Sequence, residues 1–285
     1  MAANQYDSWC QYYDPNGIEM EEIKKCAQKN CDKNSLWDNT RILEIGCGTG
    51  RFTKLMLKEK VKWIDAIDPS EERVASLNAY LARNNINNRC CAVVTTIEDF
   101  QSDGEYDIIV FSWSWAFIGD RYEEILYESR QNKKDRLIAD SRIQKENAIK
   151  KSLKLLKPNG IIISTMVENG EFEKIRGKLY YGTEHSCREL DRNIEANETL
   201  RSIISSKKSI LKNRQYSISE TKIETAFVFK TIDIAQQAIS LSLPNFDKIT
   251  DNDILNCLAG FKKSWTEKIE LSDIVCCICI KPTHN

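Results

Sequence analysis

The sequence predicts an α/β fold built on an open, mostly parallel sheet. Short apolar strands alternate with helical segments along the first 166 residues, a pattern typical of parallel sheets with helices on both faces. The first strand, Arg41 to Ile45, runs into three glycines at every second position, Gly46, Gly48 and Gly50. Such glycines permit positive φ angles and let a ligand lie against the main chain. At the carboxyl end of a strand, this turn predicts a ligand-binding site.

The second strand supports a nucleotide-like ligand. It is expected over Val61 to Ile67 and ends at Asp68, about 20 residues beyond the glycines, where a carboxylate can accept hydrogen bonds from both ribose hydroxyls. The fingerprint for dinucleotides would require glycine at position 51, which is Arg51 here. A pyrophosphate is therefore the weaker hypothesis.

Composition limits the class of protein. The 285 residues suffice for one main domain with additions. The 41 Lys and Arg nearly cancel the 42 Asp and Glu, so no overall field attracts nucleic acid or an anionic membrane. Neither a signal peptide nor an apolar run of the roughly 20 residues that span a membrane is found. We expect a cytoplasmic protein with reduced thiols, in which Cys276, Cys277 and Cys279 are buried small hydrophobes.

The glycine turn resembles motif I of the class I S-adenosylmethionine (SAM) dependent methyltransferases, an acidic-x-Gly-x-Gly-x-Gly sequence that here is Glu44 to Gly50. The segment Leu156 to Gly160, followed by the apolar strand Ile161 to Met166, resembles a second motif of that family. The resemblance implies a Rossmann-like seven-stranded sheet in the order 3-2-1-4-5-7-6, with the last strand antiparallel and helices on both faces. It also implies SAM as cofactor and S-adenosylhomocysteine (SAH) as product.

The resemblance assigns cofactor contacts along the carboxyl edge of this sheet. The expected contacts outside the adenine loop are Glu44, Gly46, Cys47, Gly48, Asp68 and Ser112. The segment Thr95 to Phe100 stands where the family has its adenine loop, with Thr96, Ile97 and Glu98 at the contact positions. Thr96 replaces the usual Asp. In the alternative interpretation, Glu98 and Asp99 cap the following turn.

The fourth strand, Tyr106 to Phe111, leads into the segment where the family differs by substrate. The motifs of DNA-methylating and cytosine C5 enzymes are missing, and Ser112 replaces the Asp that holds Mg²⁺ in catechol-type enzymes. We therefore expect transfer without a metal. Ser112, Trp113 and Trp115 are candidate substrate contacts, because the two indoles can form an aromatic wall for a flat or cationic substrate. Core packing of one of them is the alternative.

Two longer segments are expected to be additions to the sheet. Residues 120 to 142 are highly charged, and we expect them to form a surface insertion. A helix is expected to follow and to end at Lys157 to Gly160. Residues 167 to 215 are too long for a plain connection, and we interpret them as a substrate lid. This lid carries the catalytic candidates His185 and Tyr181, and Tyr181 is also a candidate substrate contact. A single histidine is more often an exposed polar residue.

The two ends of the chain complete the predicted organisation. Residues 1 to 35 form either a helix that packs on the domain or a lid, because the aromatic segment ending at Tyr13 resembles the family's Tyr-Asp segment that closes over the cofactor. Tyr13 is the expected contact. Residues 36 to 166 are the SAM-binding core, and residues 216 to 285 return to the sheet. There, Ser217 to Lys230 predicts strand six and Asp273 to Ile280 predicts strand seven. Between them, apolar residues spaced for one helix face are Ile254, Leu258, Phe261, Trp265 and Ile269.

Three functions remain open on sequence grounds. The first is methyl transfer to a nitrogen or oxygen of a small molecule or short peptide, favoured by the expected lids. The second is methylation of a protein or RNA, supported only by the 11 basic against 7 acidic residues from Asp120 to Lys157. The third is a SAM-binding regulatory domain without transfer. No DNA or membrane partner is expected, and the sequence does not give the oligomeric state.

Overall fold

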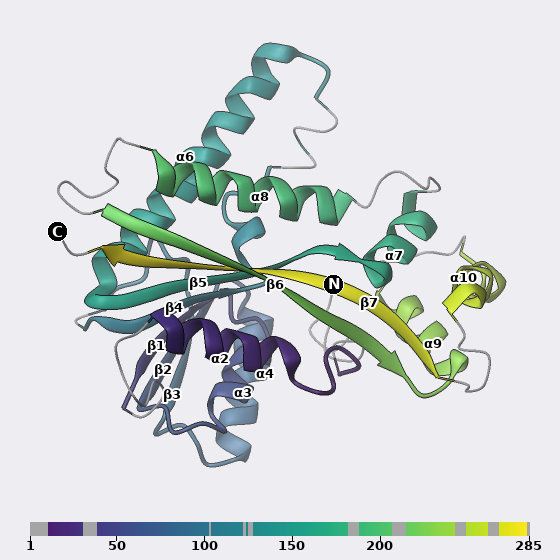
Figure 1. Ribbon diagram of the computed structural model, residues 1–285, viewed down its shortest axis with the longest axis horizontal. Coiled ribbons are helices and arrows are strands. Elements are labelled where there is room, and N and C mark those ends of the chain that lie inside the picture. The colour runs from purple at the N-terminus through teal and green to yellow at the C-terminus, as the bar shows by residue number, and fades with distance from the viewer. Residues whose placement is uncertain are drawn as a thin grey trace. The chain divides into compact units, whose positions relative to one another are not determined.

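The computed structural model contains a single seven-stranded sheet in the order β3-β2-β1-β4-β5-β7-β6 (Figure 1). The structure describes residues 11–30, 39–102, 104–121, 124, 128–181, 188–206, 215–242, 249–261 and 268–283. The pairs from β3 to β5 are parallel, whereas the last strand, β7, runs against its two neighbours. The predicted strand order and the antiparallel last strand are confirmed.

The elements follow the predicted alternation in the first half of the chain. The strands are β1 (Arg41–Ile45), β2 (Trp63–Asp68), β3 (Cys90–Val94), β4 (Tyr106–Ser112), β5 (Leu156–Gly170), β6 (Gln215–Phe229) and β7 (Ile269–Thr283). The α-helices are α2 (Ile18–Asn30), α3 (Arg51–Met56), α4 (Glu71–Arg83), α6 (Gln131–Leu155), α7 (Glu171–Tyr181), α8 (Arg188–Ser205), α9 (Ile232–Ser242) and α10 (Asp251–Leu258). Short 3₁₀ turns cover Trp115–Phe117 and Ala259–Phe261.

The chain forms two compact units. Unit 1 comprises Met1–Glu22, Val167–Ile194 and Lys222–Cys276, and unit 2 comprises Ile23–Met166, Glu195–Thr221 and Cys277–Asn285. Every one of the five boundaries falls inside a helix or strand, namely α2, β5, α8, β6 and β7. The units are therefore not joined by linkers.

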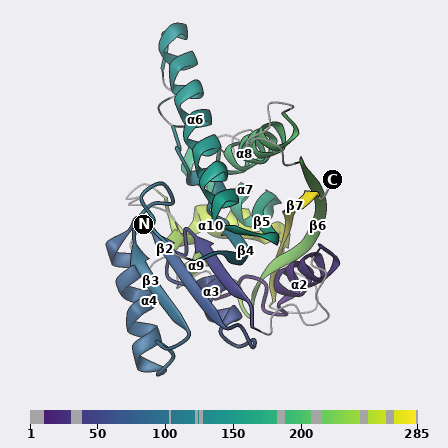
Figure 2. The ribbon, with the colours of Figure 1, turned by 90° about the vertical axis from the view of Figure 1, so that its left-hand side faces the viewer.

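Unit 2 holds the parallel strands and the helices that follow them. Residues of β1 and β4 are almost completely buried, which explains their nearly continuous apolar sequence. Helix α4 packs on β2 and β3 (Figure 2). Its N-cap is Ser70, whose side chain accepts a hydrogen bond from Arg73 N, and its buried side consists of Val74, Leu77 and Leu81.

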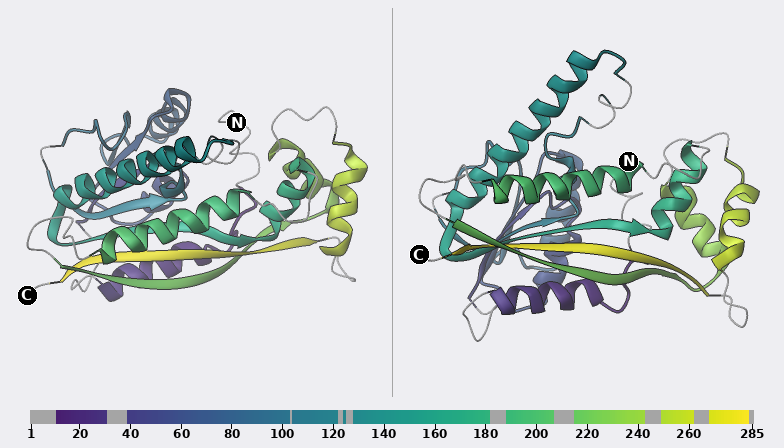
Figure 3. Two further views of the ribbon diagram at one scale, coloured as in Figure 1. Left: turned by 90° about the horizontal axis from the view of Figure 1, so that it is seen from above. Right: turned by 45° about the horizontal axis from the view of Figure 1, so that its top comes forward.

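Unit 1 is built around aromatic side chains. Phe172 of α7 stacks on Phe227 of β6 with ring centroids 4.2 Å apart, and Tyr13 packs on Phe227 at 5.1 Å. Helices α7, α9 and α10 of this unit contact one another (Figure 3). Thr250 and Asp253 form a capping box at the start of α10.

Three predicted boundaries are wrong. Residues 143–155 do not begin a separate helix, because α6 runs unbroken from Gln131 to Leu155. The helix does end before Lys157, as predicted, but the strand begins at Leu156 rather than Ile161: Leu156 pairs with Tyr106, and the register shifts before Ile108 pairs with Ile161. Ile269 does not continue the helical stripe, because it begins β7. Trp265 lies outside the described residues, and α9 was not predicted.

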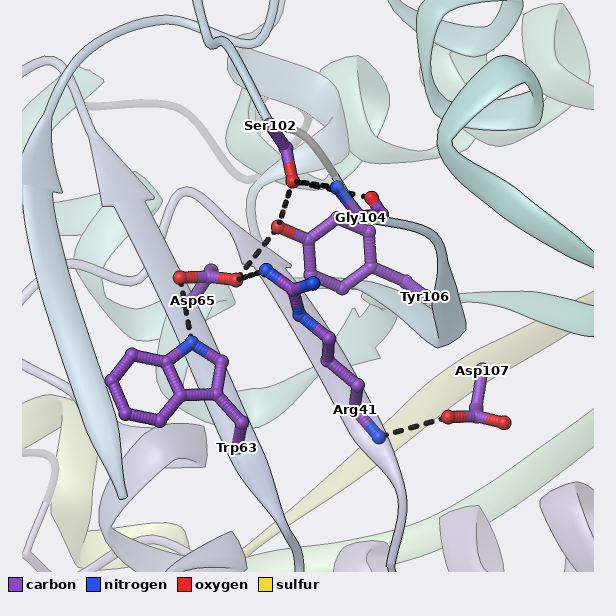
Figure 4. A network of polar contacts seen from close by, with 7 residues as sticks. All are labelled: Arg41, Trp63, Asp65, Ser102, Gly104, Tyr106 and Asp107. Carbon is purple, nitrogen blue, oxygen red and sulfur yellow. Dashed lines mark hydrogen bonds and ion pairs between the residues drawn. The ribbon is translucent and has the colours of Figure 1, made fainter. Parts of the chain in front are cut away.

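A polar network joins the amino-terminal ends of three strands, at the edge opposite the glycine turn (Figure 4). Asp65 of β2 accepts hydrogen bonds from Arg41 Nη2 at 2.9 Å, Trp63 Nε1 at 2.8 Å and Tyr106 Oη at 2.7 Å. The Arg41 guanidinium also lies over the Tyr106 ring, 4.8 Å from its centroid. These contacts stabilise the sheet at the edge away from the predicted ligand site.

Two further expectations concern the chain as a whole. Within the described residues, no helix combines the length and apolar character needed to cross a membrane. The cysteines that the structure describes carry free thiols, and Cys276, Cys277 and Cys279 are buried, as predicted.

Candidate functional site

The glycine turn follows β1 and is held by the next strand. Gly46 N and Cys47 N both donate hydrogen bonds to Ile67 O, at 2.7 and 3.0 Å. Gly46, Gly48 and Gly50 all have positive φ angles, the region that glycine enters at no steric cost. Gly50 then serves as the N-cap of α3. The turn is thus fixed by backbone geometry, as the sequence predicts.

The glycines at 46 and 48 face different surroundings. A Cβ at Gly46 would lie 2.3 Å from Ser114 Cβ, whereas a Cβ at Gly48 would meet no heavy atom within 4 Å. Gly46 is therefore required by packing, and the Gly48 backbone borders open space. Such a surface lets a ligand approach the main chain closely.

Asp68 lies beside this open backbone. Its side chain is buried, Oδ2 accepts a hydrogen bond from Gly48 N at 2.9 Å, and Oδ1 accepts one from Ser70 N at 2.9 Å. Each oxygen of this carboxylate thus accepts one backbone N–H. The structure therefore brings Asp68 and the glycine turn together, and the remaining lone pairs of the carboxylate can accept ribose hydroxyls.

Glu44, the acidic residue of motif I, is buried in β1. Its Oε2 accepts a hydrogen bond from Thr53 Oγ1 of α3. Burial raises the pKa of Glu44 to about 8, an effect that the Thr53 hydroxyl and the nearby Arg51 charge oppose. Burial likewise raises the pKa of the neighbouring Cys47 thiol. The side chains of Glu44 and Cys47 are thus both buried in the protein interior.

At the carboxyl end of β4, Ser112 and Trp113 meet Arg51 of α3. Arg51 Nη2 donates a hydrogen bond to Ser112 Oγ at 2.8 Å, and its guanidinium lies 4.3 Å from the centroid of the Trp113 ring. Trp113 has a φ of 58°, a conformation that costs energy for a bulky residue and that clusters at functional sites. Its N–H donates to Thr165 O at 2.8 Å, which fixes the strained backbone.

The predicted adenine loop is a tight local turn. Thr96 Oγ1 hydrogen-bonds to Asp99 Oδ2 at 3.0 Å, Ile97 is buried, and Glu98 is exposed. Thr95 N donates to Asp68 O at 3.1 Å, so the loop starts next to the ribose candidate. The turn-capping interpretation holds for Asp99, and the adenine contacts stay a prediction.

The remaining candidates are Trp115, Tyr13, Tyr181 and His185. Trp115 is not part of an exposed aromatic wall: its ring is fully buried against Phe111 and its Nε1 donates to Ala196 O at 2.8 Å. Tyr13 belongs to unit 1, where its hydroxyl pairs with Thr225 Oγ1 at 3.0 Å. Tyr181 ends α7, and His185 lies outside the described residues. Their proposed contacts with ligands stay predictions.

Sequence reasoning missed Arg51 and Ser114. In the sequence, position 51 matters only because the dinucleotide fingerprint requires a glycine there, whereas in the structure the Arg51 side chain reaches Ser112, 61 residues away. Ser114 Oγ donates a hydrogen bond to Ile45 O across a gap of 69 residues. The only available signal was the predicted adjacency of β1 and β4, which brings the segments that follow these strands together.

The residues present fit SAM. An open glycine backbone, a buried carboxylate at the end of the adjacent strand and a polar serine at the end of β4 face the carboxyl edge of a parallel sheet, where ligands of such sheets bind. Among the described residues, no three His, Cys, Asp or Glu side chains are arranged to hold a metal ion.

Comparison with known proteins agrees with this geometry. Residues 42–135 match the family model described as a methyltransferase domain, and no curated protein matches the chain. Among solved structures, the chain is similar to the plantazolicin methyltransferase BpumL in complex with SAH (14% identity, 98% of this chain and 87% of that chain, TM-score 0.47). It is also similar to the YcgJ protein of Bacillus subtilis (14% identity, 93% and 100%, TM-score 0.46). Residues 42–135 thus match a methyltransferase domain, and the strand order of the sheet is the one predicted for a Rossmann-like methyltransferase fold.

Proposed function

We propose that the chain transfers the methyl group of SAM to a nitrogen or oxygen of a small molecule or short peptide, without a metal ion. One observation carries the cofactor part: the Gly48 backbone borders open space and donates to the buried Asp68 carboxylate. In this proposal the glycine turn accepts the amino-acid end of SAM and Asp68 accepts the ribose.

Methyl transfer from SAM depends more on how the acceptor is positioned than on acid or base groups. SAM supplies a methyl group already activated by its sulfonium. The protein must orient the acceptor in line with that methyl and keep water away, and proximity alone contributes up to about 7–11 kcal/mol. Ser112 and Trp113, at the end of β4, are the proposed acceptor contacts in unit 2. Arg51 stacks on Trp113 and holds the indole in place.

A small acceptor is favoured by the segments added to the sheet. Between β5 and β6 the chain forms the helices α7 and α8, and between β6 and β7 it forms α9 and α10, which is more than a connection between strands requires. Transfer to a protein or RNA is the alternative. Its support is the exposure of α6, where the basic excess lies and where Ile138 and Ile143 are also exposed.

Titration calorimetry with SAH tests the cofactor assignment. Asp68→Ala removes charge-assisted hydrogen bonds worth about 1.5–3 kcal/mol each, so we expect affinity to fall at least tenfold. Asp65→Asn lies in the same strand but at its other end, and it should bind SAH as the wild type does. Unchanged affinity for Asp68→Ala would sink the assignment.

Labelled SAM then separates the acceptor classes. The protein is incubated with small-molecule, peptide, protein and RNA fractions, and transferred label is measured in each. Label in the small-molecule or peptide fraction is the expected result. Label confined to protein or RNA would favour the alternative, and SAH binding without any transfer would indicate a regulatory domain.

A further inference from the structure

Three thiols of unit 2 meet where helix α2 packs on the sheet. Cys26 lies in α2, and Cys277 and Cys279 lie in β7. Because side chains alternate along a strand, the two β7 thiols share one face of the sheet. Both of them hydrogen-bond to the Cys26 sulfur. The proposed methyl transfer uses none of the three.

Contacts of Asn30 also place the last turn of α2 on this face. Asn30 Nδ2 lies 3.8 Å from the Cys26 sulfur and 3.3 Å from Ser219 Oγ of β6, so this end of α2 lies against β6 (Figure 3). Ser217 Oγ of β6 donates a hydrogen bond to Lys281 O of β7 at 3.4 Å. Two residues further along each of these antiparallel strands, Ser219 therefore lies beside the cysteine pair of β7.

Cys26 is the member of the group that is best suited to react first. It is 8% exposed, whereas Cys277 and Cys279 are 0% and 1% exposed. Hydrogen bonds from Cys277 and Cys279, with smaller effects of Asn30 and the Lys29 charge, lower the pKa of Cys26, and burial opposes them. The thiolate is the form of cysteine that attacks peroxides and disulfides. Cys26 is therefore the expected attacking sulfur.

We propose that Cys26 is a redox modification site, at which a peroxide joins it to Cys277 or Cys279 in a disulfide between α2 and β7. The sulfurs are already in hydrogen-bonding contact, so the new bond requires only a small displacement of α2. A bound metal ion is the poorer explanation of the three thiols. Among the residues that the structure describes, no three His, Cys, Asp or Glu side chains are arranged to hold one.

The reaction has two steps, and a peroxide supplies the oxidising equivalents. The Cys26 thiolate attacks one peroxide oxygen, the O–O bond breaks, and a sulfenic acid and hydroxide form. A β7 thiol then attacks the sulfenic sulfur, the S–S bond forms, and the sulfenic oxygen leaves as water. In total the two thiols lose two electrons and two protons, and hydrogen peroxide is reduced to two molecules of water. A small dithiol reverses the reaction by thiol–disulfide exchange.

The disulfide would change the stability of the chain. It closes a covalent loop that contains most of the sheet, and such a loop restricts the unfolded chain. The oxidised protein should therefore unfold at a higher temperature than the reduced protein. This inference does not rest on the proposed function, because it concerns thiols that can be measured without SAM.

Mass spectrometry of the full chain tests the site. The protein is reduced with dithiothreitol, desalted, treated with a slight molar excess of hydrogen peroxide, alkylated and digested. We expect the peptide that contains Cys26 joined to the peptide that contains Cys277 and Cys279, with the loss of two hydrogen atoms. Dithiothreitol should release both peptides. The Tm of the oxidised protein should exceed that of the reduced protein by on the order of 5 °C.

Serine variants locate the reaction. Cys26→Ser should lose both the cross-link and the Tm difference, and so should the double variant Cys277→Ser/Cys279→Ser. The two single variants in β7 then identify the partner. Cys91→Ser is the matched control, because Cys91 is an exposed thiol of β3 whose pKa is raised by partial burial and by the Asp65 charge. This control should form the cross-link as the wild type does.

Three results would overturn the proposal. The first is a wild type in which Cys91 is oxidised before any bond between Cys26 and β7 forms, which would show that the three thiols are ordinary core packing. This measurement needs no variant. The second is a cross-link that persists in folded Cys26→Ser protein. The third is oxidation of Cys26 that dithiothreitol does not reverse. None of these outcomes depends on whether SAH binds or methyl transfer occurs.

Discussion

Gly46 and Gly48 belong to one turn but have different physical roles. The side of Gly46 that a Cβ would occupy is filled by Ser114, and the corresponding side of Gly48 is open. Both residues have positive φ angles, so any side chain at either position adds strain of roughly 1–2 kcal/mol. Packing thus predicts that alanine at the two positions will impair different properties.

Gly46→Ala should destabilise the fold, because its Cβ would lie 2.3 Å from Ser114 Cβ. Gly48→Ala should lose little more stability than the φ strain, while its methyl group enters the space proposed for SAM. Thermal unfolding and SAH calorimetry on both variants check this contrast. Normal SAH affinity in a folded Gly48→Ala protein would contradict it.

Glu44 predicts a pH dependence of stability. Its pKa of about 8 in the folded protein lies above the value of about 4.3 in an unfolded chain. Its contribution is therefore fully present below about pH 4 and is lost as pH rises toward 8, at up to roughly 1.4 kcal/mol per pKa unit. Glu44→Gln should flatten the stability curve between these values, as measured by urea unfolding. Parallel curves for the two proteins would refute this.

At the residue scale, local motifs were predictable and distant partners were not. Gly46, Gly48 and Asp68 lie together because a strand, a turn and the next parallel strand fix them within 23 residues of sequence. Arg51 and Ser112 meet only through the sheet. No local pattern encodes which polar side chain an arginine will reach. The sequence likewise does not distinguish Trp113 from Trp115, and only the packing of the fold shows that Trp115 is buried.

At the scale of elements, β1 has the predicted bounds because a turn and charged residues flank a short apolar run. The errors lie where tertiary pairing overrides local signals. Pro158 and Gly160 are typical of a turn, yet Tyr106 pairs with Leu156 and extends β5 through them. Ile269 continued a helical period by chance, and its place in β7 is set by the sheet.

The Asp65 network predicts an element-scale effect on stability alone. Asp65→Asn weakens the hydrogen bonds from Arg41 and Tyr106 (Figure 4), and we expect a loss of about 1–3 kcal/mol. Denaturant unfolding measures the loss. A large fall in SAH affinity in the same variant would contradict the assignment of this edge to stability.

At the scale of the whole molecule, metal independence is testable without knowing every contact. Once an acceptor is found, transfer should be unchanged by EDTA, since Ser112 stands where a metal-binding acid would be needed. Loss of activity with EDTA that returns with Mg²⁺ would overturn this expectation. A thousandfold loss in His185→Ala would instead show that a general base contributes beyond positioning.

The five crossings between the two units have a consequence for how such a protein can change over evolution. Because each crossing lies within a helix or strand, neither unit can be cut out, exchanged for a homologous part or duplicated without breaking hydrogen-bonded backbone. An insertion or exchange that keeps the sheet intact must therefore fall in a loop within one unit and not at a boundary between the two.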